Sequence, residues 1–242
     1  PIVIKPKDLS KYYDGYPLLC SDAVVSPNSQ YSIVSGDLIL ISTTGSQTEC
    51  GRSENEISWF DIYNGLGNSV KDNYEVELEV GYLSVSRRPI TVTTPSKSFT
   101  FDGSEKYYIE GWKAENLPSQ FAVELLSYTV ETNASVYQNS VDVKFTLNGA
   151  DVSENFKIVP NYGSLIINHL ILEVETEDLL GVVYDGNIHK NSSYQILNLA
   201  EIEGSVVYPI EISLISSKEV IKAGTHNNGV ALKVSRISDG FD

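Results

Sequence analysis

The sequence of 242 residues has no methionine, two cysteines and three histidines. No Cys-x-x-Cys or His-x-x-x-His spacing occurs, so a structural zinc site has no support in the sequence. The same shortage removes most pairs of a nucleophile with a base. We therefore expect no enzymatic activity, no catalytic residues, no cofactor and no metal.

Basic residues are also scarce, and long apolar runs are absent. Lys and Arg total 17 against 32 Asp and Glu, which gives a net charge of −15. Nucleic acids require a basic surface, so we exclude them as partners. No apolar run approaches the roughly 18 residues that cross a bilayer, and nothing at the amino end resembles a signal peptide. The sequence thus predicts no membrane insertion. Because it starts at Pro1 without Met, we expect a mature product or a piece of a longer protein.

A repeat runs through the chain, and three landmarks carry it. An aromatic-Asp-Gly tripeptide recurs as Tyr13-Asp14-Gly15, Phe101-Asp102-Gly103 and Tyr184-Asp185-Gly186. Residues 72–76 resemble residues 154–158, and each stretch leads through a glycine to an apolar strand, at 81–85 and 163–167. A turn dipeptide follows an alternating stretch at Asn64-Gly65, Asn148-Gly149 and Asp239-Gly240. These landmarks predict three modules, at residues 1–86, 87–168 and 169–242.

Alternation of apolar and polar residues predicts strands at 74–80, 141–147 and 230–237. The phase of this alternation switches between Leu83 and Val85 on one side and Ile90 and Val92 on the other. A switch of one residue reverses the buried face, so we expect the last strand of one module to lead almost directly into the next. Short helices are the only ones predicted, around 116–121 and 194–200.

These patterns favour an all-β fold of three tandem antiparallel β-sandwich (Ig-like) modules in an elongated arrangement. Strands of this length rise roughly 30 Å, so three modules in series would reach on the order of 100 Å. The third copy lacks the closing hairpin of the other two. Either the sequence stops before that module is complete, or the boundaries are shifted and the first copy is the incomplete one. In the first case an exposed sheet edge invites pairing with another chain.

The tracts 45–51, 72–76, 81–85 and 88–92, together with the Tyr-Asp-Gly that follows each first strand, resemble one known family. It is the YDG/MBG-type tandem repeat domains of bacterial cell-surface proteins, which are bacterial Ig-like modules. The second copy departs from the motif, since Phe101 stands where the family has Tyr. The resemblance implies tandem β modules in a large secreted or cell-surface protein, an extracellular location and no catalytic residues to carry over.

The tripeptides themselves are interpreted as turns rather than as a carboxylate site. Gly accepts a positive φ and Asp can bind backbone amides, while the aromatic ring packs into a core. Cys20 and Cys50 are 30 residues apart in one module, and we expect a disulfide between them, worth roughly 3–4 kcal/mol by loop closure. The alternative is two separate buried thiols.

One aromatic cluster is the least explained by strand alternation. Tyr107, Tyr108 and Trp112 could form a platform on which sugars stack, although strands also use such residues as core partners. The leading hypothesis is a stiff structural spacer or stalk, monomeric, with flanking modules of a larger surface protein as its neighbours. The alternative is an adhesin-type binding module that recognises a host glycan or protein.

Overall fold

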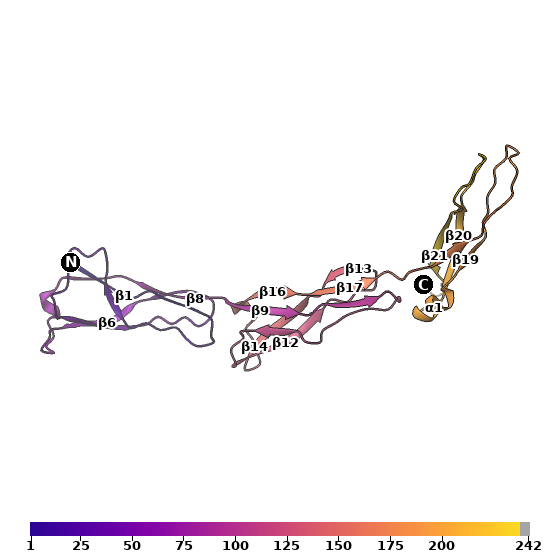
Figure 1. Cartoon of the computed structure of the whole chain (residues 1–242). Helices are drawn as coiled ribbons and strands as arrows, with labels where there is room; N and C mark the ends of the chain where they lie inside the picture. Colours follow the sequence, from indigo (N-terminus) through magenta and orange to yellow (C-terminus); the bar gives the residue numbers. More distant parts are fainter. Residues whose placement is uncertain (238–242) are drawn as a thin grey trace. The chain divides into compact units, whose positions relative to one another are not determined.

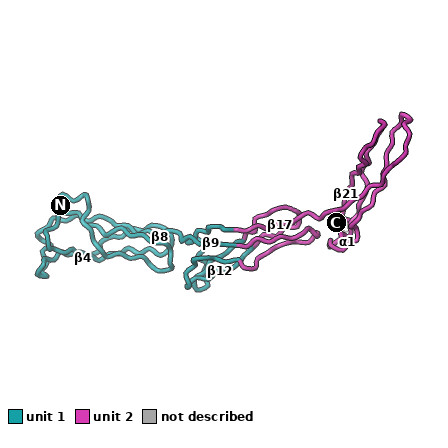
Figure 2. Tube along the Cα trace, viewed as in Figure 1, with its two compact units in different colours: residues 1–93, 112–127, 141–161 teal, residues 94–111, 128–140, 162–242 magenta. Residues whose placement is uncertain are grey.

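The computed structural model describes residues 1–237, so the turn predicted at Asp239-Gly240 lies outside the described residues. Strands hold 48% of the residues and helices 5%, which confirms the all-β class (Figure 1). Within residues 1–237 no helix is long and apolar enough to cross a membrane. The chain divides into two compact units: residues 1–93, 112–127 and 141–161 form one, and residues 94–111, 128–140 and 162–242 form the other (Figure 2).

In the first unit, residues 1–86 form three small sheets. The first sheet has the order β3-β1-β7, in which β1 pairs antiparallel with β3 and parallel with β7. The second has the order β2-β8-β5, in which β8 pairs parallel with β2 and antiparallel with β5. The third is the antiparallel pair of β4 and β6. The bounds are β1 Ile2–Pro6, β2 Leu9–Tyr12, β3 Ala23–Val25, β4 Leu38–Thr43, β5 Gly51–Asn55, β6 Ile57–Tyr63, η1 Lys71–Asn73, β7 Val76–Leu78 and β8 Gly81–Ser86.

The same unit contains two further sheets, with the orders β11-β9-β16 and β12-β14-β15. Only Arg87 separates β8 from β9, as the phase switch predicts. The alternation at 141–147 is confirmed as β14. The bounds are β9 Arg88–Thr94, β11 Lys113–Glu115, β12 Phe121–Tyr128, β14 Val141–Leu147, β15 Ala150–Asp151, η2 Ser153–Asn155 and β16 Phe156–Tyr162.

The second unit holds the sheet β10-β17-β13 and two antiparallel pairs, β18 with β19 and β20 with β21. In the three-stranded sheet, β17 again lies between a parallel and an antiparallel neighbour. One short helix, α1, runs from Leu199 to Ser205. The bounds are β10 Lys97–Thr100, β13 Ser135–Gln138, β17 Ser164–Asn168, β18 Val174–Thr176, β19 Tyr194–Ile196, β20 Ile210–Ser217 and β21 Val230–Arg236.

Isolated antiparallel bridges occur at matched places after the three tripeptides. In the second tripeptide the residue four positions after the Asp is Lys106, which pairs with Glu131. In the third it is His189, which pairs with Val220. In the first repeat the residue at that place, Leu18, pairs with Gln47. One pairing pattern therefore recurs at three matched places in the chain.

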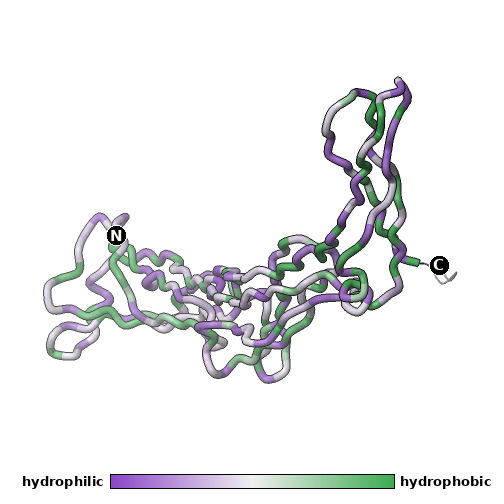
Figure 3. The backbone as a smooth tube through the Cα atoms, turned by 45° about the vertical axis from the view of Figure 1, so that its right-hand side comes forward, coloured by the Kyte–Doolittle hydropathy of each residue, from purple (hydrophilic) through white to green (hydrophobic). Residues whose placement is uncertain are grey.

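The core follows the predicted phase. Leu83 and Val85 on β8 are buried, and so are Ile90 and Val92 on β9, one residue out of phase. Figure 3 shows hydrophobic and hydrophilic stretches interspersed along the backbone trace. A second buried pair, Leu165 and Ile167, occupies the same places on β17.

Glycine is required at the start of β8 and just before β17, the middle strands of their three-stranded sheets. A Cβ on Gly81 would lie 2.5 Å from the carbonyl oxygen of Pro6, and one on Gly163 would lie 2.4 Å from the carbonyl carbon of Pro95. Such distances are too short for a side chain, so the strand can pass this backbone only at glycine. The glycine that precedes each apolar strand in the sequence is therefore a requirement of packing.

Three local predictions are wrong. The strand predicted at 74–80 is confined to β7, three residues long, and Leu78 is half exposed on it. Residues 116–121 form no helix, because Asn116 has a positive φ of 65° and Pro118 follows. The helix expected at 194–200 begins instead at Leu199, since 194–196 pair with β18 as β19.

Candidate functional site: the joints between the repeats

The three aromatic-Asp-Gly tripeptides adopt one turn. Gly15, Gly103 and Gly186 have φ angles of 79°, 84° and 81°, in the region that favours glycine. Each Asp accepts a hydrogen bond from the backbone N–H two residues later. The distances are 3.0 Å for Asp14, 2.8 Å for Asp102 and 2.9 Å for Asp185. This is the Asx-turn geometry that the Asp and Gly of each tripeptide predict.

A cationic or polar partner also fixes each of these carboxylates. Lys11 lies 2.5 Å from Asp14, Lys106 lies 2.5 Å from Asp102, and His189 Nε2 lies 2.8 Å from Asp185. The Lys106 hydrogen bond is the largest cause that lowers the pKa of Asp102 to about 2. The Asn187 side chain is the largest cause that lowers the pKa of Asp185 to about 2. Burial raises the pKa of Asp14, but hydrogen bonds from Lys11 and the Tyr16 N–H outweigh it, so that this pKa is lowered as well.

The aromatic ring of the first tripeptide packs across a joint rather than within its own repeat. Tyr13 is 1% exposed, and its ring centroid lies 5.5 Å from those of Phe121 and Phe156, both from the second repeat. Phe121 and Phe156 meet edge to face at 5.1 Å, and Phe145 lies 4.6 Å from Phe156. Aromatic pairs of this kind contribute beyond their buried area. Tyr13 is thus part of a core that two repeats share.

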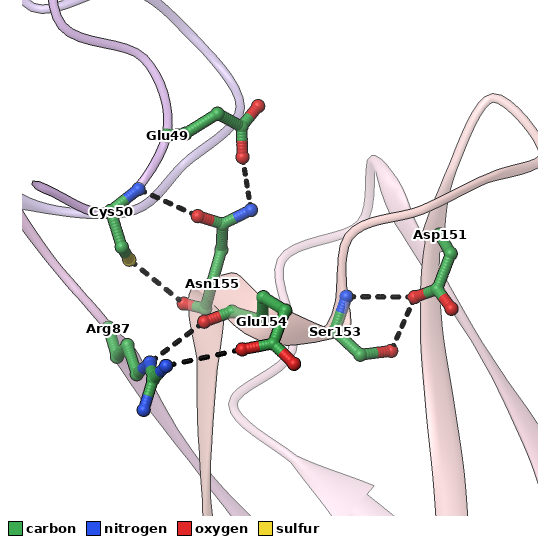
Figure 4. A network of polar contacts seen from close by, with 7 residues as sticks. All are labelled: Glu49, Cys50, Arg87, Asp151, Ser153, Glu154 and Asn155. Atoms are coloured by element: carbon green, nitrogen blue, oxygen red, sulfur yellow. Dashed lines mark hydrogen bonds and ion pairs between the residues drawn. The ribbon is translucent and has the colours of Figure 1, made fainter.

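A network of polar contacts also joins residues of the first and second repeats (Figure 4). The Asn155 side chain accepts a hydrogen bond from the Cys50 N–H at 2.7 Å and donates one to the Glu49 carboxylate. Arg87, the single linker residue, donates from Nε to the Glu154 carbonyl at 2.8 Å and pairs with its carboxylate at 3.2 Å. The Arg87 pair is exposed and so contributes little. Asn155 is buried, and it holds the first joint in register.

Further backbone contacts hold the turn of the first tripeptide. Arg88 Nε donates to the Tyr13 carbonyl at 2.5 Å, and Gln120 Nε2 donates to the Asp14 carbonyl at 2.9 Å. Both donors come from the second repeat. The turn therefore contacts the second repeat in two ways, through the packing of the Tyr13 ring and through hydrogen bonds to its carbonyl groups.

The second joint uses the same landmark. Asp102 accepts a hydrogen bond through its carbonyl from the Val207 N–H at 2.8 Å. A Cβ on Gly103 would lie 2.2 Å from Tyr208 Cε1, so only glycine permits the ring to approach. Phe101 and Tyr208 line an apolar groove of about 380 Å³, together with Ile202 and the linker residue His169. In the third tripeptide, by contrast, Tyr184 is 63% exposed.

The predicted disulfide is not formed in the structure. Cys20 and Cys50 are both free thiols. Cys20 Sγ lies 3.9 Å from the Asp22 carbonyl, whereas Cys50 Sγ donates to the Asn155 carbonyl at 3.6 Å, in the first joint. Burial is the largest cause that raises the pKa of the Cys50 thiol.

The predicted aromatic cluster is divided between the units. Tyr107 and Tyr108 lie in the second unit and Trp112 in the first. The Tyr107 ring, half exposed, meets that of Tyr128 at 5.2 Å, and Lys97 lies over the Tyr108 ring at 5.1 Å. Tyr128 was not among the candidate residues, because it is 21 positions away in the sequence.

Sequence reasoning also missed a recurring asparagine. Asn55 donates from Nδ2 to the Cys20 carbonyl at 2.8 Å, and Asn139 does the same to the Tyr108 carbonyl at 2.8 Å. Asn228 donates to the Glu177 carbonyl at 2.9 Å. The signal was present: each asparagine stands two residues before a strand that begins with Ile or Val.

Comparison with known proteins gives no assignment: no protein-family model matches the chain, and no curated protein matches it. In the described part of the chain, no three His, Cys, Asp or Glu side chains gather in a way that could hold a metal ion. The acidic residues of the tripeptides instead accept hydrogen bonds from neighbouring amides and pair with Lys11, Lys106 or His189.

Proposed function

We propose that the chain is a structural spacer, a stalk segment of a bacterial surface or secreted protein, without catalysis. In this proposal three tandem Ig-like β-sandwich modules stand in series, and flanking modules of a larger protein continue the series. The observation that carries it is the first joint, where one residue separates β8 from β9 and Tyr13 is buried against the next repeat. A joint so short and so well packed limits bending.

The second joint supports the same mechanism. There His169, Leu170 and Leu172 contribute to an apolar groove with Phe101 and Tyr208, and the tripeptide backbone accepts a hydrogen bond from Val207 through the Asp102 carbonyl. The net charge of −15 favours a soluble, unassociated monomer. The extracellular location follows from the family resemblance.

Single-molecule stretching of the full chain tests the modular part of this proposal. A module of 82–86 residues extends to roughly 290 Å, about 3.4 Å per residue. We expect separate unfolding events for the first two repeats, each with a length gain of about 260 Å once a folded length of about 30 Å is subtracted. A single event that releases the whole chain would contradict independent modules.

A non-reducing peptide map, which shows whether Cys20 and Cys50 are bridged, tests the proposed extracellular location. A Cys20–Cys50 bridge in protein secreted under oxidising conditions would favour an extracellular protein. Two free thiols after such secretion would agree with the structure and would argue against the proposed location.

The alternative function, an adhesin-type module, is favoured by the exposed ring pair of Tyr107 and Tyr128. Two aromatic rings at the surface suit a sugar face better than a core. Binding on a glycan array or to host matrix that is lost in Tyr107→Ala would support this function. The matched control is Tyr137→Ala, because that ring donates to the backbone of its own loop. Trp112→Ala tests the remaining member of the predicted cluster.

A further inference from the structure

Two tripeptides, one in the second repeat and one in the third, have the sequence Asn-x-Ser with a residue other than proline in the middle. They are Asn133-Ala134-Ser135 and Asn191-Ser192-Ser193. In exported proteins this pattern is the acceptor sequence for N-glycosylation, in which a sugar is attached to the side-chain amide of the asparagine. The pattern is short and common, so the structure around each asparagine decides whether a transferase can reach it.

The side chain of Asn133 is accessible. It is exposed, it makes no hydrogen bond within residues 1–237, and it lies in the bend between the bridge residue Glu131 and β13. Its backbone carbonyl accepts a hydrogen bond from the Tyr137 hydroxyl at 3.0 Å. Ser135, which supplies the hydroxyl of the acceptor sequence, is exposed as well and is the first residue of β13. The amide and the hydroxyl that a transferase must contact are therefore both within its reach.

The second acceptor sequence is closed by its own hydrogen bonds. Asn191 Nδ2 donates to the Glu177 carbonyl at 3.0 Å, and Asn191 Oδ1 accepts a hydrogen bond from the Ser193 N–H at 2.9 Å. The asparagine is also half-buried. A transferase would have to break both hydrogen bonds before the amide nitrogen could react. The chain thus holds one open and one closed copy of the same acceptor pattern.

The exposure at this position recurs at the first joint, where the following repeat is complete. Gln47 and Glu131 are the matched bridge residues of the first two repeats. Two positions later stand Glu49 in the first repeat and Asn133 in the second. Glu49 is exposed, although the Asn155 side chain donates a hydrogen bond to its carboxylate. A closed joint therefore leaves the side chain at this position open to solvent.

The strand that follows Asn133 leaves room for a sugar, because β13 is an edge strand of the sheet β10-β17-β13. Its counterpart in the first repeat, β5, is an edge strand too, but it carries Arg52 and Glu54. Charged residues protect an exposed sheet edge against pairing with another chain. β13 has no charged residue and exposes Val136 at 68%. A hydrophilic sugar at the start of β13 would give this edge the protection that charges give to β5.

We propose that Asn133 is an N-glycosylation site, which receives an oligosaccharide from a lipid-linked diphosphate donor. Asn133 Nδ2 forms a bond to C1 of the first sugar, the bond between C1 and the diphosphate oxygen breaks, and the lipid diphosphate leaves. The amide gives up one proton to the medium, and nothing is oxidised or reduced. The proposal rests on the proposed extracellular location, because this modification belongs to exported proteins.

Transfer in vitro to the folded full chain tests the site itself, wherever the protein resides. The chain is incubated with a lipid-linked oligosaccharide and a purified oligosaccharyltransferase that accepts Asn-x-Ser whatever the flanking residues. Intact mass and peptide mapping then follow the sugar at each asparagine. Each rate is divided by that of a synthetic peptide, 129–137 or 187–195, so that differences in local sequence cancel. We expect the normalised rate at Asn133 to exceed that at Asn191 at least tenfold.

A matched pair of variants checks that the acceptor sequence is what the transferase reads. Ser135→Ala removes the hydroxyl of the first acceptor sequence and should abolish modification of Asn133. Ser193→Ala removes an exposed hydroxyl from the second and should leave the rate at Asn133 within twofold. Unchanged circular dichroism of both variants excludes unfolding as the cause of any loss.

Three results would overturn the proposal. The first is a folded chain in which Asn133 stays unmodified while peptide 129–137 accepts the sugar. The second is an equal normalised rate at the two asparagines, and the third is the absence of transfer to both the chain and that peptide. Fractionation of the producing cells tests the location separately. A protein retained inside the cell whose Asn133 is modified in vitro would contradict the location and leave the acceptor site standing.

Discussion

The substitution Tyr13→Ala tests whether the repeats share a core. The ring is 1% exposed and contacts Phe121 and Phe156 at 5.5 Å. Truncation of a buried aromatic residue to alanine costs about 3–5 kcal/mol in free energy of unfolding. Because two of the rings that Tyr13 contacts belong to the second repeat, we expect both repeats to lose stability.

Urea unfolding followed by tryptophan fluorescence measures both effects, since Trp59 lies in the first repeat and Trp112 in the second. Tyr13→Ala should lower the midpoints of both transitions. Tyr184→Ala is the control, because it removes the ring at the same motif position in the third tripeptide, where the ring is 63% exposed. It should lower the free energy of unfolding by less than about 0.5 kcal/mol. An unchanged Trp112 transition, or an equal cost for the two substitutions, would refute the shared core.

Two further predictions concern the strand start and the turn. Gly163→Ala should destabilise by about 1–3 kcal/mol, because its Cβ would lie 2.4 Å from backbone of Pro95, whereas Gly204→Ala in α1 should stabilise slightly; thermal melts that rank the two variants the other way would contradict this packing. The folded pKa of Asp102, about 2, lies below its ordinary 3.8. Its contribution is present above about pH 4 and is lost as the pH falls through 2. Asp102→Asn should therefore flatten the loss of stability in urea melts between pH 4 and 2, and an unchanged slope would argue against the turn bond.

Local pattern was sufficient for much of the fold. The change of phase between Val85 and Ile90 predicted two successive strands with opposite buried faces, and only Arg87 separates them. Strict alternation predicted β14 to the residue. The alternation at 74–80 predicted a strand longer than β7, because the pairing of β7 with β1 covers only three residues and leaves Leu78 half exposed.

The joints required information that a single sequence does not carry. The turn geometry of Asp14 and Gly15 follows from their residue types, but the partners of Tyr13 are more than 100 residues away. No local pattern links Cys50 with Asn155 either. The recurring asparagine, Asn55 in the first repeat, was visible in the sequence and was missed because asparagine so often marks a turn.

Small-angle X-ray scattering of the whole chain tests the central claim most directly. Three modules in series, on the order of 100 Å long, predict a radius of gyration of about 30 Å. A single globule of this chain length would give about 18 Å. A value near 30 Å with a rod-like distance distribution is the predicted result, and a value near 18 Å would contradict a spacer built of serial modules.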